Sequence, residues 1–538
     1  MGCSSSAPEV PYAAKPASDK KKSLYVSDVG DVHGALTGGL VHEGKMEDFV
    51  RKYDMSKATE LGHGACGSVV AVRRRDTNDM FALKVISMNS MDKSNFDELR
   101  TEIATQKKLD HPNICKVIES FEDPRHGKMY IVMELCSGGS LVSRMKYHRH
   151  GYGEGAVATF IESMLSAVTY CHHHGVVHRD IKLDNMIFES EAEDAELKLI
   201  DFGFAMEVRV GREGMWEQLG TPSYMAPELW DKGKTTYDSA VDVWAIGVVA
   251  YMLLSGKRPF HHQDMEEKRR LIRHAELQFP SPDWDHVSDG AKDFCRALLK
   301  KRPHDRLSSA DAAQHAWIKS ASNMHRGIDA AHELEKHTEI VDSLEAFSHA
   351  DGLAKLALQV IAFSTPPAKL AELRQIFHKM DEDDSGTLSL EEFKHAMAMH
   401  PEIPQERVEQ LFNQMDVQHK GEIDYTEFLA ATVASSANFA ENGQSSILAA
   451  FNMLDADHDG YIDKKDLTRA FDGEISEAEE TQILKHCDAS GRVNFDAFKR
   501  VMLAMMQDVK DHENAHTIIT KIHKKSMMVP AGKIVQDL

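Results

Sequence analysis

Two short stretches of the chain carry side chains suited to moving a phosphoryl group. The first, HRDIKLDN, occupies residues 178–185, and the second, DFG, occupies residues 201–203. Phosphoryl transfer needs a carboxylate that receives the hydroxyl proton, a cation on the migrating phosphate and oxygen ligands for magnesium. The two stretches supply a candidate for each role: Asp180 as the proton acceptor, Lys182 as the cation, and Asn185 and Asp201 as magnesium ligands.

A glycine-rich stretch lies upstream and is suited to binding nucleotide phosphates. Residues 61–69 read LGHGACGSV, and glycines at this spacing let backbone N–H groups come close to phosphate oxygens. The pattern alone is a weak signal, but the β-prone run FALK follows at residues 81–84 and ends on Lys84. Glu102 lies on the next expected helix, before the HPNI sequence of residues 111–114, where it can pair with that lysine.

Together these motifs resemble the signature set of eukaryotic protein kinases. The resemblance begins at residue 53, ends with HAWI at residues 315–318, and implies an α+β bilobal kinase fold that binds ATP and Mg²⁺. It makes Met133 the gatekeeper and lets the backbones of Glu134 and Cys136 contact adenine. The implied nucleotide site comprises Leu61, Gly62, Gly64, Gly67, Val69, Ala82, Lys84, Glu102, Met133, Glu134, Cys136, Asn185 and Asp201.

The activation segment, residues 201–228, contains no Ser, Thr or Tyr between Gly203 and Gly220. A kinase that is switched by phosphorylation of this segment needs an acceptor there. Glu217 stands where many kinases carry a phosphothreonine, and its fixed negative charge can pair with Arg179. A merely solvated Glu217 is the alternative.

Other residues of the kinase region give structural expectations. Glu228 should be buried against Arg306, and Asp242 should support the backbone of the catalytic loop. The histidines at 172–174 suggest a metal cluster, but we favour the end of a helix that precedes the catalytic loop. Ser140 replaces the glutamate of basophilic relatives, which puts a strict preference for basic residues before the phosphosite in doubt.

Four related units follow between residues 370 and 505, and the first matches the EF-hand calcium loop throughout. Residues 381–392 place side-chain oxygens at loop positions 1, 3, 5 and 9, glycine at position 6 and a bidentate glutamate at position 12. The expected ligands are Asp381, Asp383, Ser385, Thr387 (through its carbonyl), Ser389 and Glu392.

The second and third loops depart from this pattern. The second keeps Asp416 and Glu427 at its ends, but Lys420 at position 5 repels a cation, so we expect weak binding or none. The third loop ends on Asp466, one methylene shorter than glutamate, which lowers calcium affinity or admits magnesium. Its expected ligands are Asp455, Asp457, Asp459, Tyr461, Asp463 and Asp466.

The fourth unit begins its loop at His486 and ends it at Ala497, so we expect it to bind no ion. Such a unit is retained to pair its short strand with its neighbour, here Val493 with Ile462. The tail, residues 506–538, carries several lysines but no recognisable motif.

An amphipathic junction, residues 319–369, separates the kinase region from the EF-hand units. Helical periodicity runs from Ile328 to Ala362, with Gly352 as one breaker, and produces apolar stripes. Such a stripe usually packs against any neighbour. Beside a calcium sensor it has a further use, because it can block the kinase and then enter a calcium-opened groove.

A kinase, a junction helix and four EF-hands in one chain resemble the calcium-dependent protein kinases (CDPKs) of plants and protists. The resemblance covers roughly residues 53–505. It implies transfer of the ATP γ-phosphate to protein Ser or Thr, autoinhibition by the junction, and release by calcium on the chain's own EF-hands. Two alternatives are a pseudokinase scaffold, against which the intact Lys84, Asp180, Asn185 and Asp201 argue, and a kinase that needs external calmodulin.

The N-terminal sequence MGCSSS fits N-myristoylation at Gly2, and Cys3 can be palmitoylated. One myristoyl chain anchors only marginally, so a second signal is needed. An unmodified start is the alternative. We interpret residues 1–52, rich in Ser, Ala, Pro and Gly, as a flexible tether, and expect a cytoplasmic enzyme on the cytosolic face of a membrane.

Composition narrows the remaining choices. A chain of 538 residues predicts two or more domains, and a net charge of −22 argues against a nucleic-acid partner. Seven scattered cysteines suggest free thiols in a reducing compartment. We expect a monomer whose partners are protein substrates and whose EF-hand units contact its own kinase region.

Overall fold

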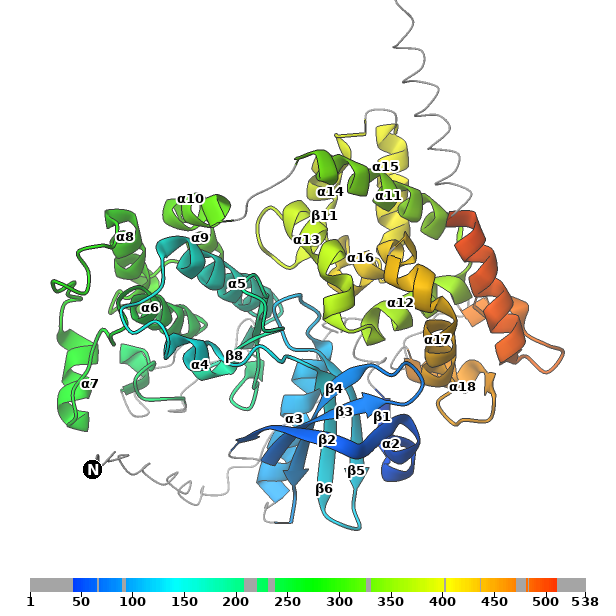
Figure 1. Cartoon of the computed structure of the whole chain (residues 1–538), viewed down its shortest axis with the longest axis horizontal. Helices are drawn as coiled ribbons and strands as arrows, with labels where there is room; N and C mark the ends of the chain where they lie inside the picture. The colour runs from blue at the N-terminus through cyan, green and yellow to red at the C-terminus, as the bar shows by residue number, and fades with distance from the viewer. Residues whose placement is uncertain are drawn as a thin grey trace, which may run out of the picture. The chain divides into compact units, whose positions relative to one another are not determined.

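The computed structural model describes residues 42–509, apart from residues 65–66, 90–92, 208–219, 231–237, 326–329, 401–402, 436, 471–479 and 482. A six-stranded sheet forms the first lobe, in the order β1–β5–β6–β4–β3–β2 (Figure 1). The strands are β1 (His42–Lys45), β2 (Tyr53–Gly64), β3 (Gly67–Arg74), β4 (Met80–Ser87), β5 (Val117–Asp123) and β6 (Lys128–Glu134), and helix α3 (Lys93–Lys108) packs on β5.

The sheet sets the nucleotide-facing residues in register. Val69 lies opposite Lys84, and Ala82 lies opposite Met133. Strand β4 is rich in apolar residues and alternates little, because both of its faces are covered: Phe81, Ala82 and Leu83 are all buried. The sheet therefore holds the lysine and the hinge strand side by side.

The ordered N-terminal edge of this lobe corrects an expectation. Residues 42–52 are not part of a flexible tether: β1 pairs in parallel with β5, and α2 (Met46–Lys52) buries Phe49 completely. The Phe49 ring stacks on Tyr53 at 5.4 Å and meets Phe121 edge-on at the same separation. One buried aromatic side chain is too sparse a signal to reveal this element from sequence. Gly2 and Cys3 lie outside the described residues.

Helices dominate the second lobe. The central helix α6 (Ala240–Ser255) is buried along its whole length, so its polar residues must find partners inside the protein. Around it lie α4 (Leu141–Met145), α5 (Glu154–His173), α7 (Met265–His274), α8 (Asp289–Leu298), α9 (Ser309–Ala313) and α10 (Ala316–His325). Short strands β7 (Val176–Val177), β8 (Met186–Phe188), β9 (Leu197–Leu199) and β10 (Met206–Glu207) and the 3₁₀ turn η1 (Leu183–Asn185) frame the catalytic loop.

The EF-hand module is helical, with two short antiparallel sheets. Strand β11 (Thr387–Ser389) pairs with β12 (Glu422–Asp424), and β13 (Tyr461–Ile462) pairs with β14 (Val493–Asn494). The second pairing joins Ile462 to Val493, which confirms the expected role of the fourth unit. The helices are α13 (Ala371–Met380), α14 (Leu390–Met397), α15 (Gln405–Met415), α16 (Tyr425–Thr432), α17 (Ala437–Leu454) and α18 (Lys464–Ala470), and residues 495–509 are also helical.

The junction is not one helix but two. Helix α11 (Ala330–His349) ends before Asp351, whose side chain accepts a hydrogen bond from the backbone of Ala354 at 3.0 Å and caps α12 (Gly352–Ser364). Asp351 and Gly352 form a cap and a start signal, which the apolar periodicity alone concealed.

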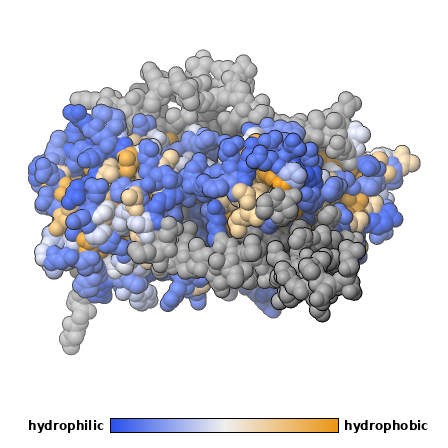
Figure 2. Space-filling model, turned by 90° about the horizontal axis from the view of Figure 1, so that it is seen from above, coloured by the Kyte–Doolittle hydropathy of each residue, from blue (hydrophilic) through white to orange (hydrophobic). Residues whose placement is uncertain are grey.

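The surface of the described residues is mainly polar. The face in Figure 2 shows hydrophilic side chains with only small apolar patches between them. Among the helices that the structure describes, none is long and apolar enough to cross a membrane.

Candidate active site and calcium sites

The catalytic loop brings the predicted phosphotransfer residues together. Asp180 Oδ2 accepts from Lys182 Nζ at 2.5 Å and from Asn185 Nδ2 at 3.3 Å. The other oxygen, Oδ1, accepts from the backbone and the hydroxyl of Thr221 at 3.0 and 2.9 Å. A carboxylate held by both oxygens keeps one orientation, as a proton acceptor for a hydroxyl requires.

Backbone strain marks the same loop. Arg179 and Asp201 adopt left-handed conformations, each with φ of 67°. Non-glycine residues in this region carry strain that the surrounding fold must overcome. Here Asp242 of α6 supplies the restraint, because its carboxylate accepts from the backbones of His178 and Arg179 at 2.9 and 2.8 Å. The expected support of the catalytic loop by Asp242 is confirmed.

Hydrogen bonding keeps Asp242 charged inside the protein. Burial raises the pKa of this carboxyl, but hydrogen bonds from His172 and the His178 backbone outweigh it and hold the pKa below the ordinary value. His172 Nε2 lies 3.0 Å from Asp242 Oδ2. His172 and His173 end α5, and His174 is its C-terminal cap. The expectation that these histidines end a helix before the catalytic loop is confirmed.

The activation segment is anchored at its end. Arg306 is fully buried and donates from Nη1 and Nη2 to the two carboxylate oxygens of Glu228, at 2.6 and 2.8 Å. The expected packing of Glu228 against Arg306 is confirmed, and the structure adds that the contact is bidentate. Glu217 lies outside the described residues, so its pairing with Arg179 stays a prediction.

The nucleotide pocket has a lysine and a glutamate in contact. Lys84 Nζ lies 3.8 Å from Glu102 Oε1. Burial raises the pKa of Glu102, and Lys84 opposes that rise. An ion pair between the strand lysine and the helix glutamate is the arrangement that a catalytically competent kinase requires. Asp201 lies near the same pair, since a Cβ on Gly203 would be 3.3 Å from Asp201 and 3.5 Å from Glu102.

The hinge is arranged so that backbone, not side chain, is left for a nucleotide. The Glu134 side chain is buried behind the hinge, where it meets Lys198 Nζ at 3.1 Å and accepts from the Lys116 backbone at 3.0 Å. Cys136 Sγ points to the same side, close to Cys115. Ser140, the residue in place of the relatives' glutamate, caps α4 by accepting from the Ser143 backbone at 3.3 Å.

The first EF-hand loop gathers carboxylates as a calcium site does. Oxygens of Asp381, Asp383 and Glu392 lie within 4.8 Å of one another. Burial and the neighbouring carboxylates raise the pKa of Asp381 well above its ordinary value. Such a crowded group of negative oxygens fits a divalent cation, which removes the repulsion.

The third loop also gathers three carboxylates. Oxygens of Asp455, Asp457 and Asp459 lie within 4.8 Å of one another. Asp466 accepts from the backbones of Asp463 and Ala456 at 2.9 and 3.0 Å, and burial raises its pKa to about 6. Its short side chain closes the loop through backbone contacts, as Glu392 does in the first loop, and the lower calcium affinity of the third loop stays a prediction.

Comparison with known proteins decides the family. The protein kinase domain family matches residues 55–318, an EF-hand domain pair matches residues 370–433, and a further EF-hand domain matches residues 446–476. Calcium-dependent protein kinase 21 of Arabidopsis thaliana is 32% identical over 463 residues, which cover 85% of this chain and 83% of the relative. The chain belongs to the calcium-dependent protein kinase family.

Other members of the family give the same picture. Calcium-dependent protein kinase 2 of Zea mays is 34% identical, over 72% of this chain and 74% of the relative. Calcium-dependent protein kinase 5 of Plasmodium berghei is 30% identical, over 72% of this chain and 67% of the relative. The CDPK described here is therefore a calcium-activated protein serine/threonine kinase with a bilobal catalytic domain and an EF-hand module, as its motifs predicted.

Polar contacts join the EF-hand module of this CDPK to its catalytic domain, as expected, but sequence reasoning did not identify the residues that make them. Arg374 of α13 donates to Glu189, which follows β8, at 2.6 Å. Thr426 of α16 donates its backbone N–H and its hydroxyl to Asp110 at 2.7 and 2.8 Å. Partners this far apart in the chain leave no local pattern.

Contacts of Lys116 and of the aromatic residues around the hinge complete this interface. Lys116 Nζ lies over the Phe363 ring, 5.0 Å from its centroid, and donates to the Thr426 hydroxyl at 3.0 Å. A small cavity behind the hinge is lined by residues of both parts, among them Ile118, Glu134, Phe363 and Tyr425. The last residues of the junction thus pack behind the hinge, on the side where the Glu134 side chain is buried and away from the nucleotide.

Proposed function

We propose that this CDPK is autoinhibited by its junction segment and that calcium releases it by drawing α12 into the EF-hand module. The observation that carries the proposal is the burial of α12. Leu353, Leu356, Val360 and Ile361 are each at most 2% exposed, and α12 packs mainly on α16 and α17. An amphipathic helix held between two EF-hand lobes is a helix-in-groove complex.

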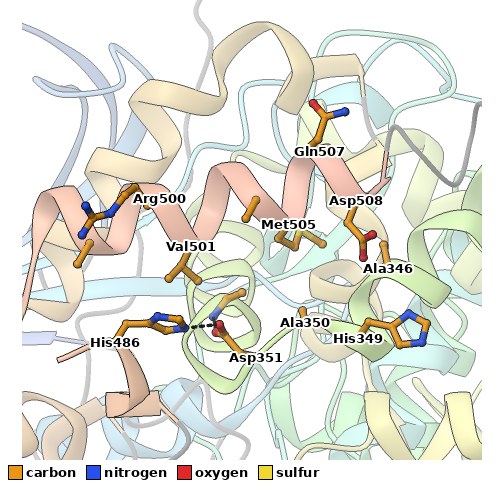
Figure 3. Close-up of a pocket in the computed structure, with 13 residues that line it drawn as sticks. Ala346, His349, Ala350, Asp351, His486, Arg500, Val501, Met505, Gln507 and Asp508 are labelled. Atoms are coloured by element: carbon orange, nitrogen blue, oxygen red, sulfur yellow. Dashed lines mark hydrogen bonds and ion pairs between the residues drawn. The ribbon is translucent and has the colours of Figure 1, made fainter.

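The corner between the two junction helices supports this view. Asp351, the cap of α12, bonds to His486 Nε2 at 2.7 Å, and His486 is position 1 of the ion-free fourth loop. Figure 3 shows this contact beside a cavity of about 510 Å³ between the corner and the helical residues 495–509. The fourth unit thus uses position 1 of its loop to contact the junction instead of an ion.

We further propose that the first and third loops bind the activating calcium, and that ATP and Mg²⁺ bind at the residues named above. Bound calcium would supply the positive charge that the gathered carboxylates lack. Calcium can shift the junction only through its differential affinity for the two arrangements. Opening of the helix pairs on calcium binding would expose the groove that α12 fills here.

Membrane attachment is a separate proposal. We infer from MGCSSS that Gly2 is myristoylated and that Cys3 is palmitoylated, which together would hold the enzyme on the cytosolic face of a membrane. Fractionation of cells that express Gly2→Ala tests it, since this variant should move to the soluble fraction.

The release mechanism is tested by truncation. Protein that ends after residue 325 keeps the catalytic domain and α10 but lacks the junction helices. Its phosphotransfer rate should be the same in EGTA and in calcium, whereas the full chain should respond with no added calmodulin. A truncated protein that still responds to calcium would place the switch elsewhere.

A further inference from the structure

The second EF-hand loop keeps the shape of a calcium loop although it carries a lysine. The residue at position 4 has a left-handed backbone conformation in each of the first three loops: Asp384, His419 and His458 have φ of 59°, 54° and 59°. The glycine at position 6 follows suit, with 83° for Gly386 and for Gly421 and 87° for Gly460. A repulsive side chain at the ion position would be expected to spread the loop, and it does not.

The Lys420 ammonium takes the place of the ion. Position 5 carries a ligand oxygen in the other loops, on Ser385 and Asp459. Here Lys420 Nζ lies 2.7 Å from Asp424 Oδ2 at position 9, while Asp416 accepts from the backbones of Lys420 and Gly421 at 2.9 and 2.7 Å. Glu427 closes the loop by accepting from the backbones of Asp424 and Val417 at 2.9 and 3.1 Å.

The charges agree with this assignment. Burial lowers the pKa of Lys420, but Asp424 and then Glu427 and Asp110 more than compensate, so that the pKa is raised. Asp424 and Glu427 are each 2% exposed, and Asp110 is fully buried. Burial raises the pKa of Asp424 and of Glu427, and Lys420 opposes the rise at both. Buried carboxylates need a cation close by, and Lys420 is the cation that the loop itself provides.

The helix that follows this loop contacts the catalytic domain. Asp424 is the N-cap of α16, and Thr426, in the first turn, gives both of its donors to Asp110. Lys116 adds a second ammonium, 3.1 Å from Asp110. The orientation of this helix start, and with it the Asp110 contact, depends on the closed second loop.

We propose that the Lys420 ammonium is the resident cation of the second loop, so that the second EF-hand is a preformed, calcium-insensitive docking surface for Asp110 of the catalytic domain. This inference rests on the proposed function, in which calcium acts through the other loops. It assigns the second unit to docking and leaves sensing to the first and third.

Calcium uptake by the full chain tests the cation assignment, measured by equilibrium dialysis against ⁴⁵Ca²⁺. Lys420→Asp supplies the missing ligand and should bind one more ion than the wild type. Glu427→Gln should bind as many ions as the wild type, and so should Lys485→Asp, which makes the same charge change at an exposed lysine of the module. No extra ion on Lys420→Asp, or one ion fewer on Glu427→Gln, would overturn the proposal.

Hydrogen exchange of the full chain at saturating calcium tests the docking. Lys420→Met should speed exchange in residues 424–432 by about tenfold or more, whereas Lys420→Arg, which keeps a cation, should not. Lys420→Asp should recover the lost protection in calcium and lose it in EGTA, which separates the missing charge from misfolding. Exchange at the wild-type rate in Lys420→Met would overturn this proposal and would leave the proposed calcium activation untouched. A wild-type protein whose activity does not respond to calcium would overturn the proposed function instead.

Discussion

Arg374 and Glu189 form a buried ion pair, with Nη1 and Oε2 2.6 Å apart, between the first EF-hand helix and the catalytic domain. Both side chains are almost fully covered, at 5% and 7% exposure. Removing one partner of such a pair leaves a buried charge uncompensated. The pair therefore couples the conformation of the EF-hand module to the segment of the catalytic domain that follows β8.

Substitution of Arg374 should weaken the active arrangement. Loss of one partner of a buried pair costs about 3–5 kcal/mol, so Arg374→Met should lower the maximal calcium-stimulated rate and the melting temperature in calcium. Arg407→Met is the matched control, because Arg407 pairs with Glu345 within the module and its junction. Equal effects of the two substitutions would argue against a bracing role for Arg374.

Asp180→Asn should abolish most phosphotransfer and spare nucleotide binding. The carboxylate orients and deprotonates the substrate hydroxyl, and loss of such a group typically costs 10²–10⁴-fold in rate. Turnover on a generic peptide and ATP affinity by fluorescence would be measured side by side. Asp194→Asn, at an exposed position between β8 and β9, should leave both unchanged. Substantial turnover by Asp180→Asn would refute the catalytic assignment.

The calcium titration should respond unequally to the loops. Glu392→Gln removes a charge from the fullest ligand set and should raise the calcium needed for half-activation more than Glu427→Gln does. Asp466→Ala should also raise it, because the third loop loses its closing carboxylate, whereas substitution of Ala497 should have no effect. The assay is the initial rate as a function of free calcium. An unshifted curve for Glu392→Gln would contradict the assignment of the first loop.

Activation should need no upstream kinase. The activation segment offers no hydroxyl between Gly203 and Gly220, so bacterially expressed, phosphatase-treated protein should keep its calcium-stimulated rate. Glu217→Ala should lower that rate by removing the fixed charge that we expect to pair with Arg179. Activity that arises only after another kinase phosphorylates Thr221 would contradict both expectations.

Sequence reasoning succeeded where partners are set by compact motifs. The catalytic loop and the Ile462–Val493 pairing follow from residues whose spacing is fixed by their own chemistry, and the Glu228–Arg306 pair was implied by the resemblance to protein kinases. It failed where few residues carry the signal. Phe49 is the one fully buried side chain among the described residues of α2, and Asp351 caps the second junction helix without disturbing the apolar periodicity.

Sequence reasoning could not identify the contacts between the catalytic domain and the EF-hand module, for a different reason. Glu189 and Arg374 are 185 residues apart, and Asp110 and Thr426 are 316 apart. Each residue alone resembles any surface charge or helix-start hydroxyl. Only the folded chain shows that they are buried together. The lysine in the second loop was likewise expected to repel an ion, and only the folded chain shows that its ammonium lies 2.7 Å from Asp424 at position 9 of the loop.

The central claim is that calcium, acting on the chain's own EF-hands, turns on phosphotransfer. The most direct measurement is the rate at which purified full-length protein phosphorylates a peptide across a titration of free calcium, with ATP and Mg²⁺ saturating and no other protein present. The account predicts a low rate in EGTA that rises steeply with calcium. A rate that is flat across the titration, or that rises only when calmodulin is added, would contradict it.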